Sequence, residues 1–387
     1  MPSAPPTSTL RSAWADDGVY LRRPPARRKK RDPRLLALYA FALLLVGYAG
    51  LTRLPWFQAL SPTATPTRSA GSYADEAAGL AARGQTNRAL ALYDRALSIE
   101  PRDVEALVGR AGLLLLRERY ADAVASANAA LKTDPDNSRA MAVAAQTLDW
   151  SGDLELARGY AERAVEANDH DAYACAVLAE VLTDLGDIVG ARNAAERALA
   201  LDPGNAMAHR NHGYVLERQG LYREALAEYE EAARLDTYSF VYYVNMGYTY
   251  MAMRQMDEAI ARFEVATQKD PDSAMALDAL AWTMVSEGNY EEAILVLERA
   301  VKADPNHARA NAHLGAAHYI RLDYEKAIPY LRHAVELGAS GAATYYQLGL
   351  SLAYTDQCEQ ALPYLRQALS IDPESAPARA GLSTCQR

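Results

Sequence analysis

The 387-residue sequence repeats its local chemistry at a strict interval of 34 residues. The interval carries no insertion or deletion from the first mark to the last: Pro101, Pro135, Asp169, Pro203, Thr237, Pro271, Pro305, Ala339 and Pro373. A period of this length is typical of a helix pair that is repeated and stacked into a solenoid. The sequence therefore predicts an all-α fold whose core grows by one layer with each unit.

Small residues occupy three columns when the chain is aligned in blocks of 34 that begin at Ala70. The eighth place is Ala or Gly in every block, and the twentieth and twenty-seventh places are Ala in all nine. Tiny side chains at fixed places let helix backbones approach closely, so we interpret these columns as core. The turn between the two helices is marked by glycines, which accept a left-handed helix end at little cost: Gly84, Gly152, Gly186, Gly220 and Gly288.

The twenty-fourth place is aromatic or apolar in most blocks, as at Tyr93, Tyr229 and Phe263, and the thirty-second is often Pro. Together with the small columns, this pattern resembles the tetratricopeptide repeat (TPR). The resemblance implies a right-handed superhelical solenoid of about 18 helices, with a capping helix at 376–387. Nine units are expected across residues 70–375: 70–103, 104–137, 138–171, 172–205, 206–239, 240–273, 274–307, 308–341 and 342–375.

The N-terminal region differs in composition from the repeats. Residues 1–34 hold nine Lys or Arg against three Asp and have no packable pattern, so we expect a disordered basic tail. Residues 35–52 contain a 17-residue run without a charge, which favours a single transmembrane helix. A buried core helix and a cleaved signal peptide are the alternatives, and an uncleaved anchor is preferred because the basic segment before the run is unusually long. Residues 53–69 are rich in Pro, Ser and Thr and are expected to be a linker.

Charge predicts the topology and limits the partners. Basic residues stay on the cytoplasmic side of a membrane, so the tail should be cytoplasmic and the repeats extracytoplasmic, in a single-pass protein of a bacterial cell membrane. From Ser69 onward 46 acidic residues outnumber 29 basic ones. An acidic surface repels phosphate backbones, and we therefore expect no nucleic-acid partner.

The resemblance implies that the first helix of each unit lines a concave groove that holds an extended segment of a partner protein. Tyr and Trp supply rigid contact area with a polar group, which suits such a surface. Packing between helices is the alternative role for these aromatic residues. The aromatic candidates at groove-facing places are Trp150, Tyr173, Tyr214, Tyr248, Trp282, Tyr319 and Tyr346.

Polar side chains complete the candidate groove. Asn211, Asn245, His313 and Gln347 share the sixth place and resemble, incompletely, the asparagine ladder of protein O-GlcNAc transferase repeats; such amides can bind a peptide backbone. Arg210 stands beside them. Arg and acidic residues are mixed at these places, so neither a purely acidic nor a purely basic ligand is favoured.

No motif in the sequence predicts catalysis. The chain lacks a phosphate-binding Gly loop with Lys, a metal-spaced His and Glu pair and a nucleophile elbow. His209 and His212 lie one helical turn apart, but no carboxylate or Cys joins them in phase, and core or groove histidines are the simpler interpretation. We therefore expect no enzyme activity, no cofactor, no metal and no small-molecule substrate.

Three cysteines remain. Cys175 falls at a core place and is expected to be a buried thiol. Cys358 opens the second helix of the ninth unit and Cys385 lies late in the capping helix, so stacking should bring them to the same end of the solenoid. In an oxidising compartment the two can form a disulfide that pins the cap.

These features together predict a membrane-anchored scaffold that binds peptide segments or partner subunits in its groove. An assembly chaperone or a regulatory subunit of a membrane or envelope complex is the alternative, since residence time is not encoded in the sequence.

Overall fold

The computed structural model describes residues 33–52 and 68–386, and the chain divides into two units, Met1–Thr67 and Arg68–Arg387. In the first unit, the run predicted to cross a membrane forms helix α1 (Pro33–Thr52). Across the described residues, no helix combines the length and the apolar character that a bilayer span requires. The predicted basic tail, apart from its last two residues, and the predicted linker, apart from its last two, lie outside the described residues.

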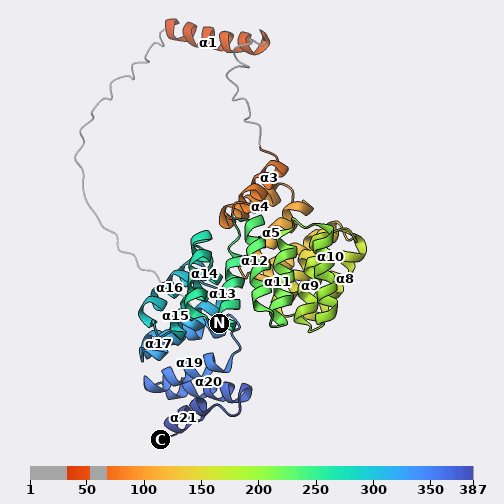
Figure 1. The fold of residues 1–387 in the computed structure, drawn as a ribbon. Coiled ribbons are helices and arrows are strands. Elements are labelled where there is room, and N and C mark those ends of the chain that lie inside the picture. The colour runs from red at the N-terminus through yellow and green to blue at the C-terminus, as the bar shows by residue number, and fades with distance from the viewer. Residues whose placement is uncertain (1–32, 53–67, 387) are drawn as a thin grey trace, which may run out of the picture. The chain divides into compact units, whose positions relative to one another are not determined.

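The second unit is a solenoid of helix pairs (Figure 1). Its described residues form helices and turns and contain no β-strand. The first helix of each pair, called A, is α3 (Ala70–Ala81), α5 (Val104–Leu116), α7 (Ser138–Ser151), α9 (Ala172–Asp184), α11 (Ala206–Arg218), α13 (Val241–Ala252), α15 (Ala274–Ser286), α17 (Ala308–Ile320) or α19 (Ala342–Tyr354). The second, called B, is α4 (Thr86–Ile99), α6 (Tyr120–Thr133), α8 (Leu154–Ala167), α10 (Ile188–Leu201), α12 (Tyr222–Leu235), α14 (Met256–Lys269), α16 (Tyr290–Ala303), α18 (Tyr324–Glu336) or α20 (Cys358–Ile371). Helix α21 (Ala376–Cys385) follows the last pair. The predicted all-helical TPR-type solenoid is thus confirmed.

Side-chain caps define where the A helices begin. Asp103, for example, accepts a hydrogen bond from the backbone N–H of Ala106, which satisfies one of the unpaired donors at the helix start. The same N-cap arrangement occurs at Ser69, Asn137, Asp171, Asn205, Ser273 and His307. A capping side chain therefore marks the start of seven of the nine A helices, whereas α13 follows Phe240 and α19 follows Gly341 without a side-chain cap.

The turn between helices A and B has a left-handed residue at the same place in every unit. Glycine fills it in five units, as predicted, including Gly84 at φ +69° and Gly152 at φ +92°. The other four units place a side-chain-bearing residue there: Glu118, Arg254, Leu322 and Asp356. The turn geometry is therefore set by the stacking of the pair, and it is kept even where the residue resists it.

The small columns permit the close helix packing that the sequence predicted. Ala at the twentieth and twenty-seventh places is fully buried in each pair. At the eighth place, a methyl group added to Gly247 would lie 2.5 Å from the ring of Phe263, and one added to Gly213 would lie 2.8 Å from that of Tyr229. Glycine at these two places makes room for the aromatic residue of helix B.

A disulfide joins α20 to α21. Cys358 and Cys385 are bonded, with their Cα atoms 5.2 Å apart, and this is the pair that the sequence singled out. Cys175 is buried as a free thiol. The bond ties the last helix to the ninth pair, where no further unit covers the core.

Candidate functional site

The A helices line the inside of the superhelix. Side chains from α5, α7, α9, α11 and α13 enclose a cavity of about 220 Å³, together with Asp236 and Ser239 from the turn before α13. Trp150, Tyr173 and Arg210, three of the predicted groove residues, line it. These three side chains therefore face the cavity, whereas Asn211 is fully buried and does not line it.

The carboxylate of Glu180 is the centre of a buried polar network in this region. It accepts hydrogen bonds from Trp150 Nε1 (2.8 Å) and Gln146 Nε2 (3.0 Å). It also forms an ion pair with Arg210 and accepts a bond from Asn211 Nδ2 (3.3 Å). Burial opposes ionisation of Glu180, but the charge of Arg210 and the hydrogen bonds from Arg210, Trp150 and Gln146 together outweigh it, and the pKa of the carboxyl is lowered.

Further groups extend the network and use up the polar atoms of the predicted ladder. Asn211 is fully buried and its amide also donates to the carbonyl of Ala176 (2.7 Å). Asn245 accepts from Arg210 Nε (3.3 Å), and Tyr214 donates to Asp184. These side chains are engaged with one another, so in this conformation they do not present free amides to a ligand.

The ring of Tyr173 is sandwiched into the same wall. Its hydroxyl donates to Gln146 Oε1 (2.9 Å), and the guanidinium of Arg139 lies 3.3 Å from the ring centroid. Arg139 is exposed and lines the cavity. The exposed guanidinium of Arg139 therefore covers the ring of Tyr173 as a cation over an aromatic face.

Asp149 is the anomalous acid of the network. Its side chain is 5% exposed, and neither carboxylate oxygen receives a hydrogen bond. Burial, together with the charges of Glu180 and Asp184, raises the pKa of Asp149 to about 9. The carboxyl is therefore neutral at physiological pH.

A second group of predicted groove residues lies on α15 and α17. The rings of Trp282 and His313 stack with centroids 4.0 Å apart, and His313 Nδ1 is 2.6 Å from Asp278 Oδ1. Burial opposes the charge of Asp278, but His313 and Arg309 outweigh it and lower its pKa. Trp282 and His313 are only half-buried, so this stack is open to a ligand.

Aromatic residues continue along α17 to α19. Tyr319 contacts Tyr324, whose ring lies 4.8 Å from that of Tyr354, and Tyr354 is 50% exposed. Burial and the neighbouring phenols raise the pKa of Tyr319 to about 12, so its hydroxyl stays protonated and can donate a hydrogen bond. The other candidates here, Tyr346 and Gln347, are half-buried on α19, and Tyr248 on α13 is 37% exposed with its ring against Phe263.

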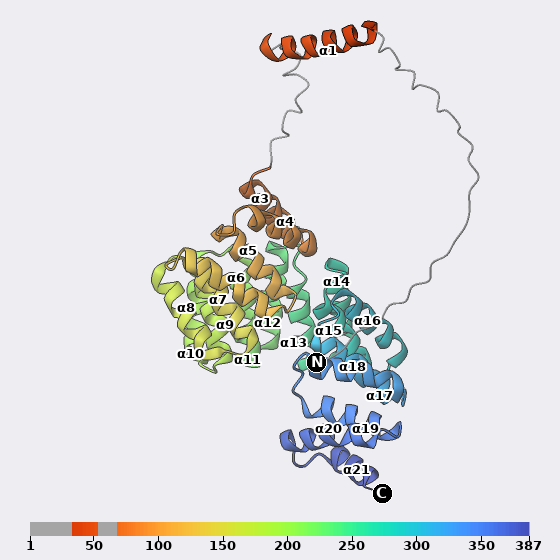
Figure 2. The same cartoon turned by 180° about the vertical axis from the view of Figure 1, so that it is seen from behind.

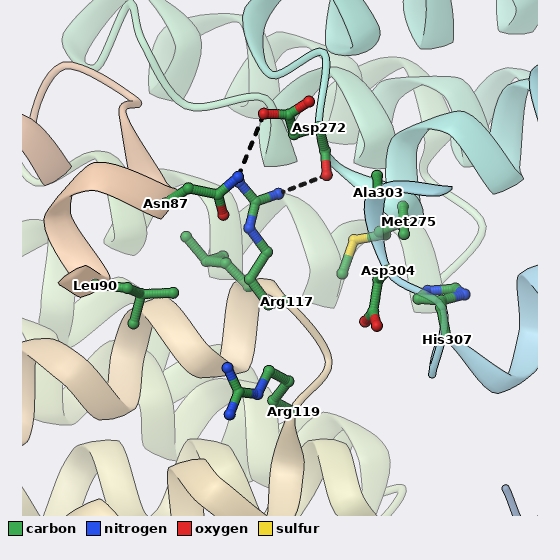
Figure 3. A pocket seen from close by; sticks show the side chains of 11 residues that line it. Asn87, Leu90, Arg117, Arg119, Asp272, Met275, Ala303, Asp304 and His307 are labelled. Carbon is green, nitrogen blue, oxygen red and sulfur yellow. Dashed lines mark hydrogen bonds between the residues drawn. The ribbon is translucent and has the colours of Figure 1, made fainter. Parts of the chain in front are cut away.

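The sequence did not predict that the superhelix would touch itself. The turns of the first two pairs contact the turns before α15 and α17, across a small cavity of about 160 Å³ (Figure 3). Asn87 Nδ2 lies 3.3 Å from Asp272 Oδ2, and Arg117 Nη1 donates to the Asp272 carbonyl (3.1 Å). Arg117 also forms a 3.0 Å ion pair with Asp270 in which both side chains are nearly buried. We call this self-contact the seam.

The seam continues at Glu118, in the left-handed turn of the second pair. Glu118 forms ion pairs with Arg309 Nη2 (3.1 Å) and His307 Nε2 (2.9 Å) at the start of α17. Burial of His307 opposes its charge, but Glu118 outweighs it and raises the pKa of the ring. His307 Nδ1 must stay unprotonated to accept the N-cap bond from Ala310, so the cap and the charge make opposed demands on this ring.

The hydrogen-bond partners of the predicted site residues could not be inferred from the sequence. It identified Arg210 and the inward-facing aromatic residues, and it noted that Arg and acidic residues were mixed, but it did not pair Arg210 with Glu180. The seam joins residues about 190 positions apart. No local spacing can reveal such a contact, and the one available signal was a non-glycine residue, Glu118, at a place that favours glycine.

One negative finding concerns metals. Within residues 33–52 and 68–386, no group of three or more His, Cys, Asp or Glu is arranged to hold a metal ion. His209 and His212, the pair considered in the sequence, both contact Glu228, at 2.6 and 3.2 Å. The hydrogen bonds and charges of these rings outweigh the burial of Glu228 and lower its pKa.

The chain belongs to the tetratricopeptide repeat family. Family models of that description match residues 80–147, 177–240, 244–305, 279–342 and 342–375, which together exceed half of the chain. No curated protein matches the sequence.

Solved structures share the fold at low sequence identity. The crystal structure of the APC/C hetero-tetramer Cut9-Hcn1 matches at 18% identity and a TM-score of 0.57, over 83% of this chain and 65% of that one. This chain thus spans slightly less than two thirds of that protein. The human IFIT1 dimer with m7Gppp-AAAA matches at 17% identity and a TM-score of 0.52, over 79% of this chain and 90% of that one. Pseudomonas aeruginosa pilF matches at 19% identity and a TM-score of 0.50, over 56% of this chain and 98% of that one. At these identities the likeness concerns the fold alone.

Proposed function

We propose that this protein is a scaffold that binds an extended segment of a partner protein along the inner face of its A helices, and that α15 to α19 form the primary site. The half-exposed stack of Trp282 on His313 carries this proposal, because it offers a rigid aromatic anchor that a partner can cover, and such anchors dominate peptide interfaces. Tyr319, Tyr346 and Gln347 continue the same surface. The family supports it in general terms, since TPR proteins bind protein partners.

The test selects peptides from a random display library on the immobilised full chain and measures their affinity by fluorescence anisotropy. Trp282→Ala and Tyr346→Ala should each weaken binding about tenfold or more, equivalent to about 1.4 kcal/mol. Leu295→Ala is the control, because Leu295 on helix B of the same repeat as Trp282 is 62% exposed. Equal affinity of the parent and both aromatic variants would place the binding surface elsewhere.

We further propose that the repeats act outside the cytoplasm, in a bacterial membrane protein held by the N-terminal segment, and that they act by binding rather than by catalysis. A bonded Cys358–Cys385 pair is what an oxidising compartment permits. The basic residues before the apolar run support the orientation. Protease added to intact cells with a permeable outer layer should digest the repeats; protection until the membrane is ruptured would reverse the orientation.

The alternative role, an assembly chaperone or regulatory subunit, uses the same surface with faster release. Dissociation kinetics of a captured partner distinguish the two, since a scaffold holds its partner for minutes or longer and a chaperone exchanges it.

A further inference from the structure

We propose that the seam is a latch that closes the inner face of α5 to α13, and that release of the seam opens this half of the superhelix to an extended peptide. The proposal deepens the proposed function, on which it rests for the identity of the ligand. The latch itself is testable with no ligand present.

The first step concerns what holds the seam. In a solenoid, each repeat needs contacts only with its neighbours. The contacts between the second unit and the turns before α15 and α17 are therefore not required for stacking. They are made by a few polar groups, chiefly Arg117 and Glu118 (Figure 3 shows the Arg117 side). Leu116 adds an apolar contact to the cluster around Phe240 and Val244. Figure 2 shows the solenoid from behind, with α5 to α11 at the left and α14 to α18 at the right.

The second step concerns what closure does. The cavity lined by these helices, of about 220 Å³, is smaller than the roughly 300–1,000 Å³ of ordinary ligand sites. Trp150, Arg210 and Asn211 are hydrogen-bonded to Glu180 and not to solvent. A peptide that lies along these helices therefore needs a wider space than the closed state provides.

The third step concerns why the latch can open. Glu118 adopts φ +54°, and the three other non-glycine residues at the same place in other units also adopt a positive φ, so stacking of the helix pair holds this turn and its backbone need not change when the seam opens. The side-chain partners of Glu118, which are His307 and Arg309, would regain water on opening, so the pairs contribute much less than their Coulomb energy. The closed and open states are consequently separated by a small number of ion pairs and by the apolar contacts of Leu116 and Trp150 with the cluster around Phe240 and Val244. The contacts between neighbouring repeats are the same in both states.

The test measures how fast a cysteine inside the cavity reacts with a bulky maleimide in the full chain. Met207→Cys supplies this probe, because Met207 lines the cavity. Gln347→Cys on α19 supplies the reference, because Gln347 does not line this cavity. The native cysteines do not interfere, since Cys175 is buried and the other two are bonded.

Arg117→Gln with Glu118→Gln should raise the reaction rate of Met207→Cys about tenfold relative to the reference, which equals about 1.4 kcal/mol of lost closure. The matched control is Arg158→Gln with Glu162→Gln, an exposed pair on α8 with the same change of charge, which should leave the ratio unchanged. Salt screens ion pairs, so 1 M NaCl should raise the ratio of the Met207→Cys rate to the reference rate in the parent. The same salt should raise this ratio less in the seam variant, which has already lost the ion pairs.

An unchanged ratio in the seam variant, with helical circular dichroism retained, overturns the latch. If the double variant loses its helical signal, the single variant Glu118→Gln and the salt series decide in the same way. Because no peptide takes part, failure here leaves the peptide site on α15 to α19 to be judged by its own experiment.

Discussion

Removal of the proton-holding acid Asp149 should make the protein more stable, and increasingly so as the pH rises. The acid has an ordinary pKa of about 3.9 in an unfolded chain. Its folded pKa is about 9, because it is buried beside Glu180 and Asp184. Between these values the folded chain holds a proton that the unfolded chain has lost, so the free energy of unfolding falls by about 1.4 kcal/mol per pH unit.

The magnitude follows from the distance between the two pKa values. At pH 7 the proton bound by Asp149 has reduced the free energy of unfolding by up to about 4 kcal/mol relative to pH 4, and at pH 5.5 by about 2 kcal/mol. Asp149→Asn keeps a neutral side chain of the same shape whose amide can donate to Asp184, and it has no proton to lose. The variant should therefore exceed the parent in stability by up to these amounts at each pH.

The assay is urea unfolding followed by circular dichroism at pH 4, 5.5, 7 and 8.5. The control is Asp136→Asn, in an exposed turn, which should follow the parent at every pH. Solenoids can unfold in parts, so exchange protection of α7 and α9 should be compared as well. A parent and an Asp149→Asn variant that differ by the same amount at all four values would refute the reasoning, since Asp149 would then ionise in the folded state.

Three further predictions concern the turns, the small columns and the cap. Gly152→Ala should lower the free energy of unfolding by about 1 kcal/mol, because φ +92° strains any side chain. Gly159→Ala within α8, where nothing lies within 4 Å of the added methyl group, should raise it by about the same amount. Thermal unfolding compares the two variants, and equal effects would contradict the turn argument. Gly247→Ala should lower stability by about 2 kcal/mol or more, since its methyl group would meet Phe263 at 2.5 Å; an unchanged melting temperature would show that the ring moves aside. Cys358→Ser should lower the local stability of α20 and α21 by about 3 kcal/mol, because it opens a loop whose ends are 27 positions apart in sequence. Hydrogen exchange of these two helices measures the change, and unaltered protection would mean that the last helix stays packed without the bond.

Much of the fold is local and could be predicted. A helix pair of fixed length recurs because the same residue types recur at the same places, so the A helices begin within one residue of the predicted unit starts. The cap residues before α5 and α7 and the glycines at 84 and 152 each act within a few positions of themselves. Such effects can be inferred from spacing, because the backbone angle or the hydrogen bond involves only neighbours in sequence.

The candidate site was predicted only in part. The places that face inward follow from helix geometry, and Trp150, Tyr173 and Trp282 lie on the inner wall or beside it. Whether such a residue is free is a different matter. Trp150 bonds to Glu180, which is 30 positions away, and Trp282 stacks on His313, which is 31 away. Partners one repeat apart decide whether a side chain stays available to a ligand.

By itself the sequence determined the repeat, its two-helix unit, the turn geometry and the inward face, because each of these depends on contacts within one period of 34 residues. Only the tertiary structure decided how tightly the units wind. Small rotations between successive pairs accumulate over six repeats until Glu118 meets His307 and Arg309. That sum is not encoded at any one position, and it determines which distant turns of the chain come into contact.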